Sequence, residues 1–136
     1  MKTKTKVIAY IFRTNRQEIL VFDHRDFPEV GTQVVGGTVE ENEDFKMALK
    51  REIFEEAGLI TDTKLMSKIG ETIYHRKDKP EQNIRHYYEV ITNDLPDSWS
   101  HIVESSGADN GMVFHFYWMP IHEAKLKLDG NFGELL

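Results

Sequence analysis

The segment GTVEENEDFKMALKREIFEEAGL, residues 37–59, contains the clearest helix signal in the chain. Asp44 is a suitable N-cap, helix-forming residues fill positions 45–57 without a proline, and Gly58 is a natural residue to end the helix. The segment therefore predicts a helix over residues 45–57. The feature of this helix that needs an explanation is its acidic content.

Three carboxylates crowd one face of this predicted helix. At 100° per residue, Glu52, Glu55 and Glu56 fall within an arc of about 100°. Each like-charged pair at such spacings destabilises a helix by about 0.2–0.5 kcal/mol, and Lys46 and Lys50 point away from the acids. A hard divalent cation such as Mg²⁺ would offset the repulsion. The alternative interpretation is a solvated acidic face or a protein interface.

Apolar residues of the same helix form two stripes. Leu49, Ile53 and Ala57 make one stripe, and Met47 and Phe54 lie almost opposite the acids. The two stripes predict that the helix is covered on more than one side. The carboxylates would then border a packed region rather than open water.

Strands are predicted on both sides of the helix. The β-branched and aromatic content of the chain, with its turn residues, indicates the following elements: a hairpin of residues 5–13 and 18–25, a loop over 26–36 that leads into a brief strand, strands over 63–76 and 83–92, a polar loop over 93–110, a strand over 111–119, and a second helix opened by Pro120 and reaching about Leu128. This order predicts an α/β fold with a mixed central sheet between helices. A length of 136 residues fits a single domain over 1–136.

Composition excludes several kinds of chemistry. The chain has no cysteine, so disulfides, thiolate metal sites and cysteine nucleophiles are excluded. The net charge is −6, and the absence of a long basic stripe predicts no extended nucleic-acid surface. The apolar run near the amino terminus is too short for a signal peptide, and no apolar segment approaches the roughly 20 residues that span a bilayer. A cytoplasmic protein without membrane contact is expected.

Residues 37–59 resemble the Nudix box, a motif with residues of fixed type at fixed spacing. Every defined position of the motif is filled, by Gly37, Glu43, Arg51, Glu52, Ile53, Glu55, Glu56, Gly58 and Leu59. The resemblance to the Nudix hydrolases, which include MutT-like enzymes, implies the Nudix fold, an α/β/α sandwich. The box then forms a loop, a helix and a second loop.

The resemblance also implies a reaction. A Nudix pyrophosphohydrolase cleaves a nucleoside diphosphate linked to another moiety by attack of water on phosphorus, with Mg²⁺ or Mn²⁺. By position, Glu52, Glu55 and Glu56 would hold metal together with the carbonyl of Gly37, and Glu52 is alternatively the base. Arg51 would orient a carboxylate through a forked hydrogen bond. Glu43 would pair with Arg51 or support the loop.

Residues outside the box supply further candidates. Nudix enzymes often recruit a downstream carboxylate, and in the 93–110 loop Glu104 is preferred over Asp109. His101 shares that loop. Arg25, Phe27 and Tyr88 are candidates to contact the phosphates or base of the substrate.

Departures from the pattern bear on the substrate. Val35 precedes Gly36 and Gly37 where many relatives carry proline, Thr32 and Gln33 stand where an aromatic residue is common, and Asn42 replaces a frequent glycine. Oxidised nucleotides, dinucleoside polyphosphates, ADP-ribose and RNA ends all remain open as substrates. A catalytically silent Nudix-like module that binds a nucleotide is the alternative function, and a homodimer is compatible with the sequence.

Overall fold

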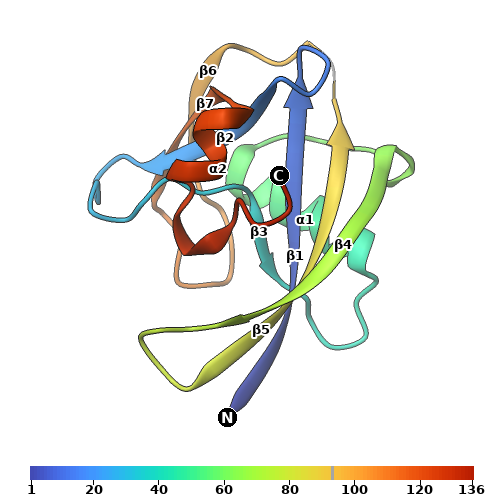
Figure 1. The fold of residues 1–136 in the computed structure, drawn as a ribbon, viewed down its shortest axis with the longest axis vertical. Helices are drawn as coiled ribbons and strands as arrows, with labels where there is room; N and C mark the ends of the chain where they lie inside the picture. The colour runs from blue at the N-terminus through green and yellow to red at the C-terminus, as the bar shows by residue number, and fades with distance from the viewer. Residues whose placement is uncertain (93) are drawn as a thin grey trace.

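The computed structural model describes residues 1–92 and 94–136, so Asn93 of the predicted 93–110 loop lies outside the described residues. A seven-stranded mixed sheet is flanked by two helices (Figure 1). The elements are β1 (Lys2–Arg13), β2 (Glu18–His24), β3 (Gly36–Thr38), α1 (Phe45–Ala57), the 3₁₀ turn η1 (Thr63–Leu65), β4 (Met66–His75), β5 (Glu81–Ile91), β6 (Ser98–Ile102), β7 (Val113–Pro120), α2 (Ile121–Lys127) and the 3₁₀ turn η2 (Asp129–Asn131).

Strand β1 organises the sheet. It pairs in parallel with β5 along nearly its whole length, from Lys2 opposite Glu81 to Phe12 opposite Ile91. Its other edge pairs antiparallel with β3 near Val7 and with β2 at Phe12 and Arg13. The strand order is β4-β5-β1-β2-β7-β6, with β3 joined to β1. The short strand β3 therefore leaves its outer edge open beside β1.

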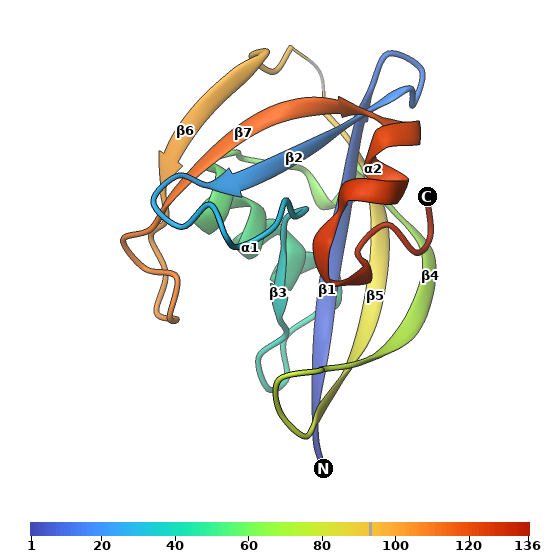
Figure 2. The same ribbon diagram turned by 60° about the vertical axis from the view of Figure 1, so that its left-hand side comes forward.

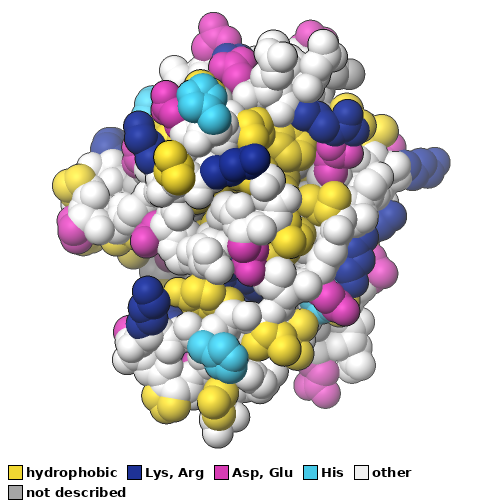
Figure 3. Space-filling model, in the orientation of Figure 1, with side chains coloured by type: hydrophobic (Ala, Val, Ile, Leu, Met, Phe, Trp, Pro, Cys, Tyr) yellow, Lys and Arg dark blue, Asp and Glu magenta, His cyan; other side chains and the backbone are white. Residues whose placement is uncertain are grey.

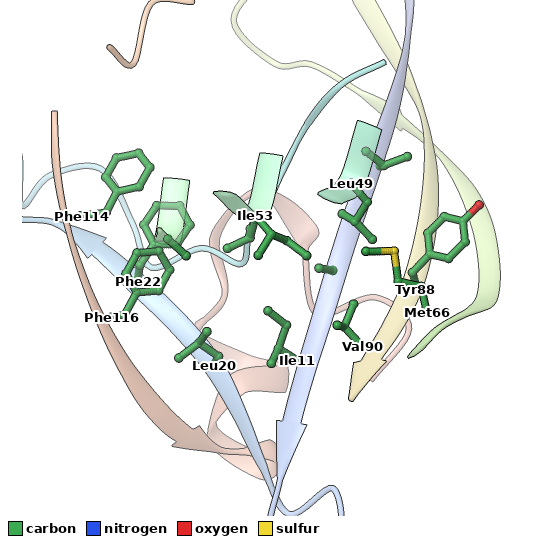
Figure 4. Packing of buried hydrophobic residues seen from close by; sticks show 14 of the residues in the cluster. Ile11, Leu20, Phe22, Leu49, Ile53, Met66, Tyr88, Val90, Phe114 and Phe116 are labelled. Carbon is green, nitrogen blue, oxygen red and sulfur yellow. The ribbon is translucent and has the colours of Figure 1, made fainter. Parts of the chain in front are cut away.

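The alternation of β1 divides the interior into two cores. Val7, Ala9 and Ile11 pack with Leu49 and Ile53 of α1, and Figure 4 shows Ile11, Leu49 and Ile53 in this cluster. On the opposite face, Ile8 and Tyr10 pack toward α2, where Ala124 and Leu128 are buried. Figure 2 shows α1 and α2 on opposite sides of the sheet. The predicted α/β/α sandwich with a mixed sheet is confirmed.

The local predictions around α1 also hold. The Asp44 side chain accepts a hydrogen bond from the backbone N–H of Met47 at 3.1 Å, and the helix spans Phe45–Ala57 as expected. The N-terminal hairpin is confirmed by the pairing of β1 and β2. The second helix follows Pro120 and spans Ile121–Lys127.

Two predictions about packing and chain path are wrong. Met47 and Phe54 are 51% and 52% exposed, so α1 is covered by the sheet along the Leu49–Ile53 stripe and not on its opposite side. Residues 98–102, placed in the polar loop, form the edge strand β6, which is held by pairing with β7 alone. The alternation of apolar and polar residues in this segment is short and flanked by polar residues, so the sequence gives only a weak strand signal. The strand forms because it pairs with β7.

Gly58 ends α1 in the left-handed conformation that the sequence predicts, with φ +74° and its N–H donating to the carbonyl of Phe54 at 3.0 Å. A Cβ at this position would lie 2.8 Å from Nδ1 of His101. We expect Gly58→Ala to lower the free energy of unfolding by about 1–3 kcal/mol, because backbone strain and a steric clash add. Urea denaturation measures this loss.

The matched control for Gly58→Ala uses His101→Ala as the background. In that background only the backbone strain remains, so the cost of Gly58→Ala should fall to about 1 kcal/mol. An equal cost in both backgrounds would contradict a contact between Gly58 and the His101 ring.

Candidate active site

Arg51 is the centre of an ion-pair network on α1. Its Nε and Nη2 donate to the two carboxylate oxygens of Glu43, both at 2.9 Å, and its Nη1 donates to Oε1 of Glu52 at 2.9 Å. The same Nη1 lies 3.4 Å from Oε2 of Glu55, and Nη2 donates to the carbonyl of Thr38 at 3.1 Å. Arg51 therefore ties the acidic face of α1 to β3.

Glu43 has both of the roles that its position in the box suggests. It forms the fork with Arg51, and its Oε1 accepts the backbone N–H of Glu40 at 3.0 Å. The hydrogen bonds from Arg51 hold the pKa of Glu43 below its usual range. The ionised carboxylate of Glu43 therefore links the loop before α1 to Arg51 of the helix.

The paired glycines let the acids of α1 reach the open edge of β3. The N–H of Gly36 donates to Oε1 of Glu56 at 3.1 Å. A Cβ at Gly37 would overlap the carboxyl group of Glu52, so the glycine leaves room for that carboxyl group in its present orientation. The Glu56 residue is 6% exposed, and the side chains of Glu52 and Glu55 are 12% and 19% exposed. The carboxylates border a packed region, although α1 is covered by the sheet on one side only.

Burial and like charge raise the pKa values of two of these acids. Burial raises the pKa of Glu52 to about 7, and Glu55 adds to the shift while Arg51 opposes it. Burial also places the pKa of Glu56 well above its usual range, with further contributions from Glu52, Asp109 and Glu55. Buried acids with raised pKa values are typical of functional sites, where a bound cation can supply the positive charge that the protein itself does not provide.

The donor set fits a hard divalent cation. Glu52, Glu55 and Glu56 offer carboxylate oxygens, the ligands that Mg²⁺ and Mn²⁺ prefer. Among residues 1–92 and 94–136, no three acidic or histidine side chains already converge on one metal position. The guanidinium of Arg51 instead holds Glu52 and Glu55. Binding of a cation would therefore require these two carboxylates to turn from Arg51 toward Glu56.

Two acids of the downstream loop bear on this helix. The negative charge of Asp109 contributes to the raised pKa of Glu56, after the larger effects of burial and Glu52. Glu104 donates its backbone N–H to the carbonyl of Glu55 at 3.3 Å, and its side chain lines a 350 Å³ hollow at the carboxyl end of α1, beside Trp99 and His101. The loop is closed by a hydrogen bond of 2.8 Å from the N–H of Val103 to the carbonyl of Met112, a contact that the residue types alone do not reveal.

The three predicted substrate contacts lie in different surroundings. Arg25 is exposed after β2 and pairs with Asp26 at 3.0 Å, and Phe27 is 45% exposed in the following turn. Tyr88 is 5% exposed and belongs to the core under α1. Its ring packs with Leu49 and Met66 (Figure 4), so it offers little surface for a base.

The fold and the site define a class of protein: an α/β/α sandwich that presents clustered carboxylates from one helix at a glycine-lined strand edge. A family model described as NUDIX domain matches residues 2–135. The chain therefore belongs to the Nudix family, and it is a hydrolase acting on pyrophosphate bonds. A search of curated proteins gave no significant match.

Solved structures with the same fold include three that cover nearly all of this chain. The MutT protein from Methanosarcina mazei Go1 is 16% identical, with a TM-score of 0.71 over 98% of this chain and 90% of that one. The NUDIX domain of Shewanella oneidensis NrtR, complexed with ADP ribose, is 14% identical, with a TM-score of 0.69 over 99% and 84%. The E. coli dihydroneopterin triphosphate pyrophosphohydrolase is 17% identical, with a TM-score of 0.65 over 98% and 94%.

Proposed function

We propose that this protein is a metal-dependent pyrophosphohydrolase that cleaves a phosphoric anhydride bond in a nucleotide or nucleotide derivative. The observation that carries the proposal is the burial of Glu52 and Glu56 against Gly37 and Gly36, with pKa values raised by burial and mutual repulsion. A divalent cation would relieve this repulsion. The NUDIX family model supports the reaction class.

Each residue of the site has a role in this proposal. Glu52, Glu55 and Glu56 would hold Mg²⁺ or Mn²⁺ together with the carbonyl of Gly37. The cation, when bound, would neutralise the diphosphate and lower the pKa of bound water. Before a cation binds, Arg51 holds Glu52 and Glu55 through its hydrogen bonds. Its fork to Glu43 would keep the guanidinium in place after these two carboxylates turn to the cation.

Glu52 is also suited to accept a proton from the attacking water. Without a cation its pKa is raised to about 7, so it exchanges a proton near neutral pH. The two roles given to Glu52 are alternatives, since a carboxylate oxygen that holds a cation is a weaker base. Asp109 then becomes the downstream carboxylate that we favour over Glu104, because its charge acts on Glu56.

The nucleotide class of the substrate is proposed from the neighbours. One solved Nudix domain is complexed with ADP ribose, and another is named for a triphosphate substrate. Both share the fold of this chain at identities of only 14% and 17%. The chemical group attached to the phosphates of the substrate is therefore to be identified by experiment.

A substrate panel tests the function. Purified protein is incubated with Mg²⁺ or Mn²⁺ and a set of nucleoside triphosphates, dinucleoside polyphosphates, ADP-ribose and capped or triphosphorylated RNA, and products are identified by mass spectrometry. We expect hydrolysis of at least one compound, loss of activity with chelator, and recovery on addition of metal. Tight binding without any product would instead favour the catalytically silent module.

A further inference from the structure

Lys6 lies on β1 beside the acidic site without an acidic partner. Its Nζ donates to the hydroxyl of Thr38 at 2.7 Å, next to Gly37, and across the described residues no carboxylate oxygen lies within 4.0 Å of it. Burial lowers the pKa of Lys6, and the neighbouring Lys4 adds to this effect while Glu81 and Glu52 oppose it. A half-buried ammonium in this position has a cost that an anionic ligand would offset.

Three further cations surround one buried carboxylate near Lys6. Glu81, which is 3% exposed, lies 3.5 Å from Nζ of Lys4, 3.6 Å from Nη1 of Arg76 and 3.9 Å from Nζ of Lys79. A hydrogen bond from Asn83 lowers the pKa of Glu81 to about 2, and the charges of the three cations add to this effect. Because one carboxylate faces three cations, positive charge remains in excess even after Asp78 pairs with Arg76.

The cations form a path that leads away from the carboxylates of α1. Every second residue of β1 points to the same face of the sheet. This face carries Lys4, Lys6, Ile8 and Tyr10, and Ile8 and Tyr10 pack on the α2 side. Lys6 stands opposite Thr38 in the pairing of β1 with β3, and Lys4 is one side-chain repeat nearer to the amino terminus. Figure 1 shows that this end of β1 projects beside the β4–β5 hairpin, which contributes Arg76 and Lys79 to the turn.

We propose that Lys6 and Thr38 bind a phosphate group of the substrate adjacent to the site of cleavage, and that Lys4, Arg76 and Lys79 accept the next phosphate. This inference rests on the proposed hydrolase function. It assigns the substrate class to compounds with three or more consecutive phosphates, because a diphosphate would leave the outer cations unused. Lys6 acts here as a positioning residue, and the acids of α1 remain the catalytic groups.

The inference is tested by calorimetric titration with inorganic triphosphate and inorganic phosphate, in chelator and at low ionic strength, where charge interactions are least screened. We expect the wild-type protein to bind triphosphate at least about tenfold more tightly than phosphate. Lys6→Met should weaken triphosphate binding about tenfold, and Arg76→Met about threefold. Lys6→Arg should keep most of the affinity, because it retains the charge. An exposed lysine on α2 supplies the control, Lys125→Met, which should bind triphosphate as the wild type does.

Folding and kinetics separate this role from a structural one. Lys6→Met removes a half-buried charge, so its urea midpoint should be no lower than that of the wild type. With Mg²⁺, Lys6→Met should raise KM about tenfold for both a nucleoside triphosphate and ADP-ribose. Arg76→Met should raise KM for the nucleoside triphosphate about threefold and leave KM for ADP-ribose unchanged. Equal binding of triphosphate and phosphate by the wild type, or unchanged triphosphate binding by Lys6→Met, would overturn the inference. Selective triphosphate binding without hydrolysis of any substrate would sustain the subsite and refute the proposed function.

Discussion

Replacing Glu56 by glutamine is expected to lower kcat by about 10³-fold or more while leaving the protein folded. Glutamine keeps the shape of the side chain, and its carbonyl oxygen can still accept the N–H of Gly36. It removes the negative charge that would hold the cation, and a lost metal ligand of this kind costs several kcal/mol of transition-state stabilisation. Steady-state kinetics with the best substrate of the panel, with Mg²⁺ and Mn²⁺, measure the effect.

The same substitution should stabilise the protein when metal is absent. Burial raises the pKa of Glu56 in the folded state, so the folded protein binds a proton more readily than the unfolded chain. The wild type is therefore penalised above its folded-state pKa and recovers stability as pH falls through that value. We expect Glu56→Gln to exceed the wild type in urea midpoint at pH 8 in chelator, with a smaller difference at pH 5.

Glu41→Gln is a matched control, because Glu41 is an exposed acid in the loop before α1. Its kcat and urea midpoint should equal those of the wild type within error. If Glu56→Gln kept more than half of the wild-type activity, Glu56 would not be a metal ligand. A Glu56→Gln protein less stable than the wild type in chelator at pH 8 would contradict the unfavourable burial of its charge.

The part of the site that is local in sequence could be predicted from it. Asp44 and Gly58 cap α1 as their residue types indicate, and the 3.6-residue period places Glu52 and Glu56 on one face. Arg51 forms the expected fork, with Glu43 as its partner. Capping, helical period and short-range ion pairs depend on residues a few positions apart, which is why the sequence is informative about them.

Features that depend on strand pairing could not be predicted in this way. The edge strand β6 exists through its pairing with β7, and the exposure of Phe54 follows from the sheet covering one side of α1. The effect of the Asp109 charge on the pKa of Glu56 depends on the closure of the loop between β6 and β7. Lys6 meets Thr38 because β1 pairs with β3, across 32 residues of sequence.

Surface charge illustrates the same limit. The net charge of −6 gives no indication of a basic cluster, and Figure 3 shows acidic and basic side chains intermingled on the face that carries α2. The cluster around Glu81 arises when the start of β1 meets the turn between β4 and β5. Composition averages over the chain, whereas recognition depends on which charges the fold brings together.

Replacing Arg51 by methionine is expected to lower the free energy of unfolding by about 3 kcal/mol at pH 7, because the mostly buried carboxylates of Glu43, Glu52 and Glu55 lose their shared cation. Arg51→Lys keeps one positive charge but cannot form the fork to Glu43, so it should lose about half as much. The adjacent Lys50→Met, which leaves this network intact, should change stability by less than about 0.5 kcal/mol. Urea denaturation in chelator measures all three variants.

The pH dependence of Arg51→Met distinguishes a lost ion pair from a simple packing defect. Arg51 lowers the folded-state pKa of Glu43, so this pair stabilises the wild type above the unfolded-state pKa and the contribution is lost as pH falls through the folded-state value. The difference between wild type and Arg51→Met should therefore be largest near pH 7 and shrink below pH 4. A difference that stayed constant over this range would mean that Arg51 acts through the packing of its side chain, and the acids of α1 would then need another source of neutralisation.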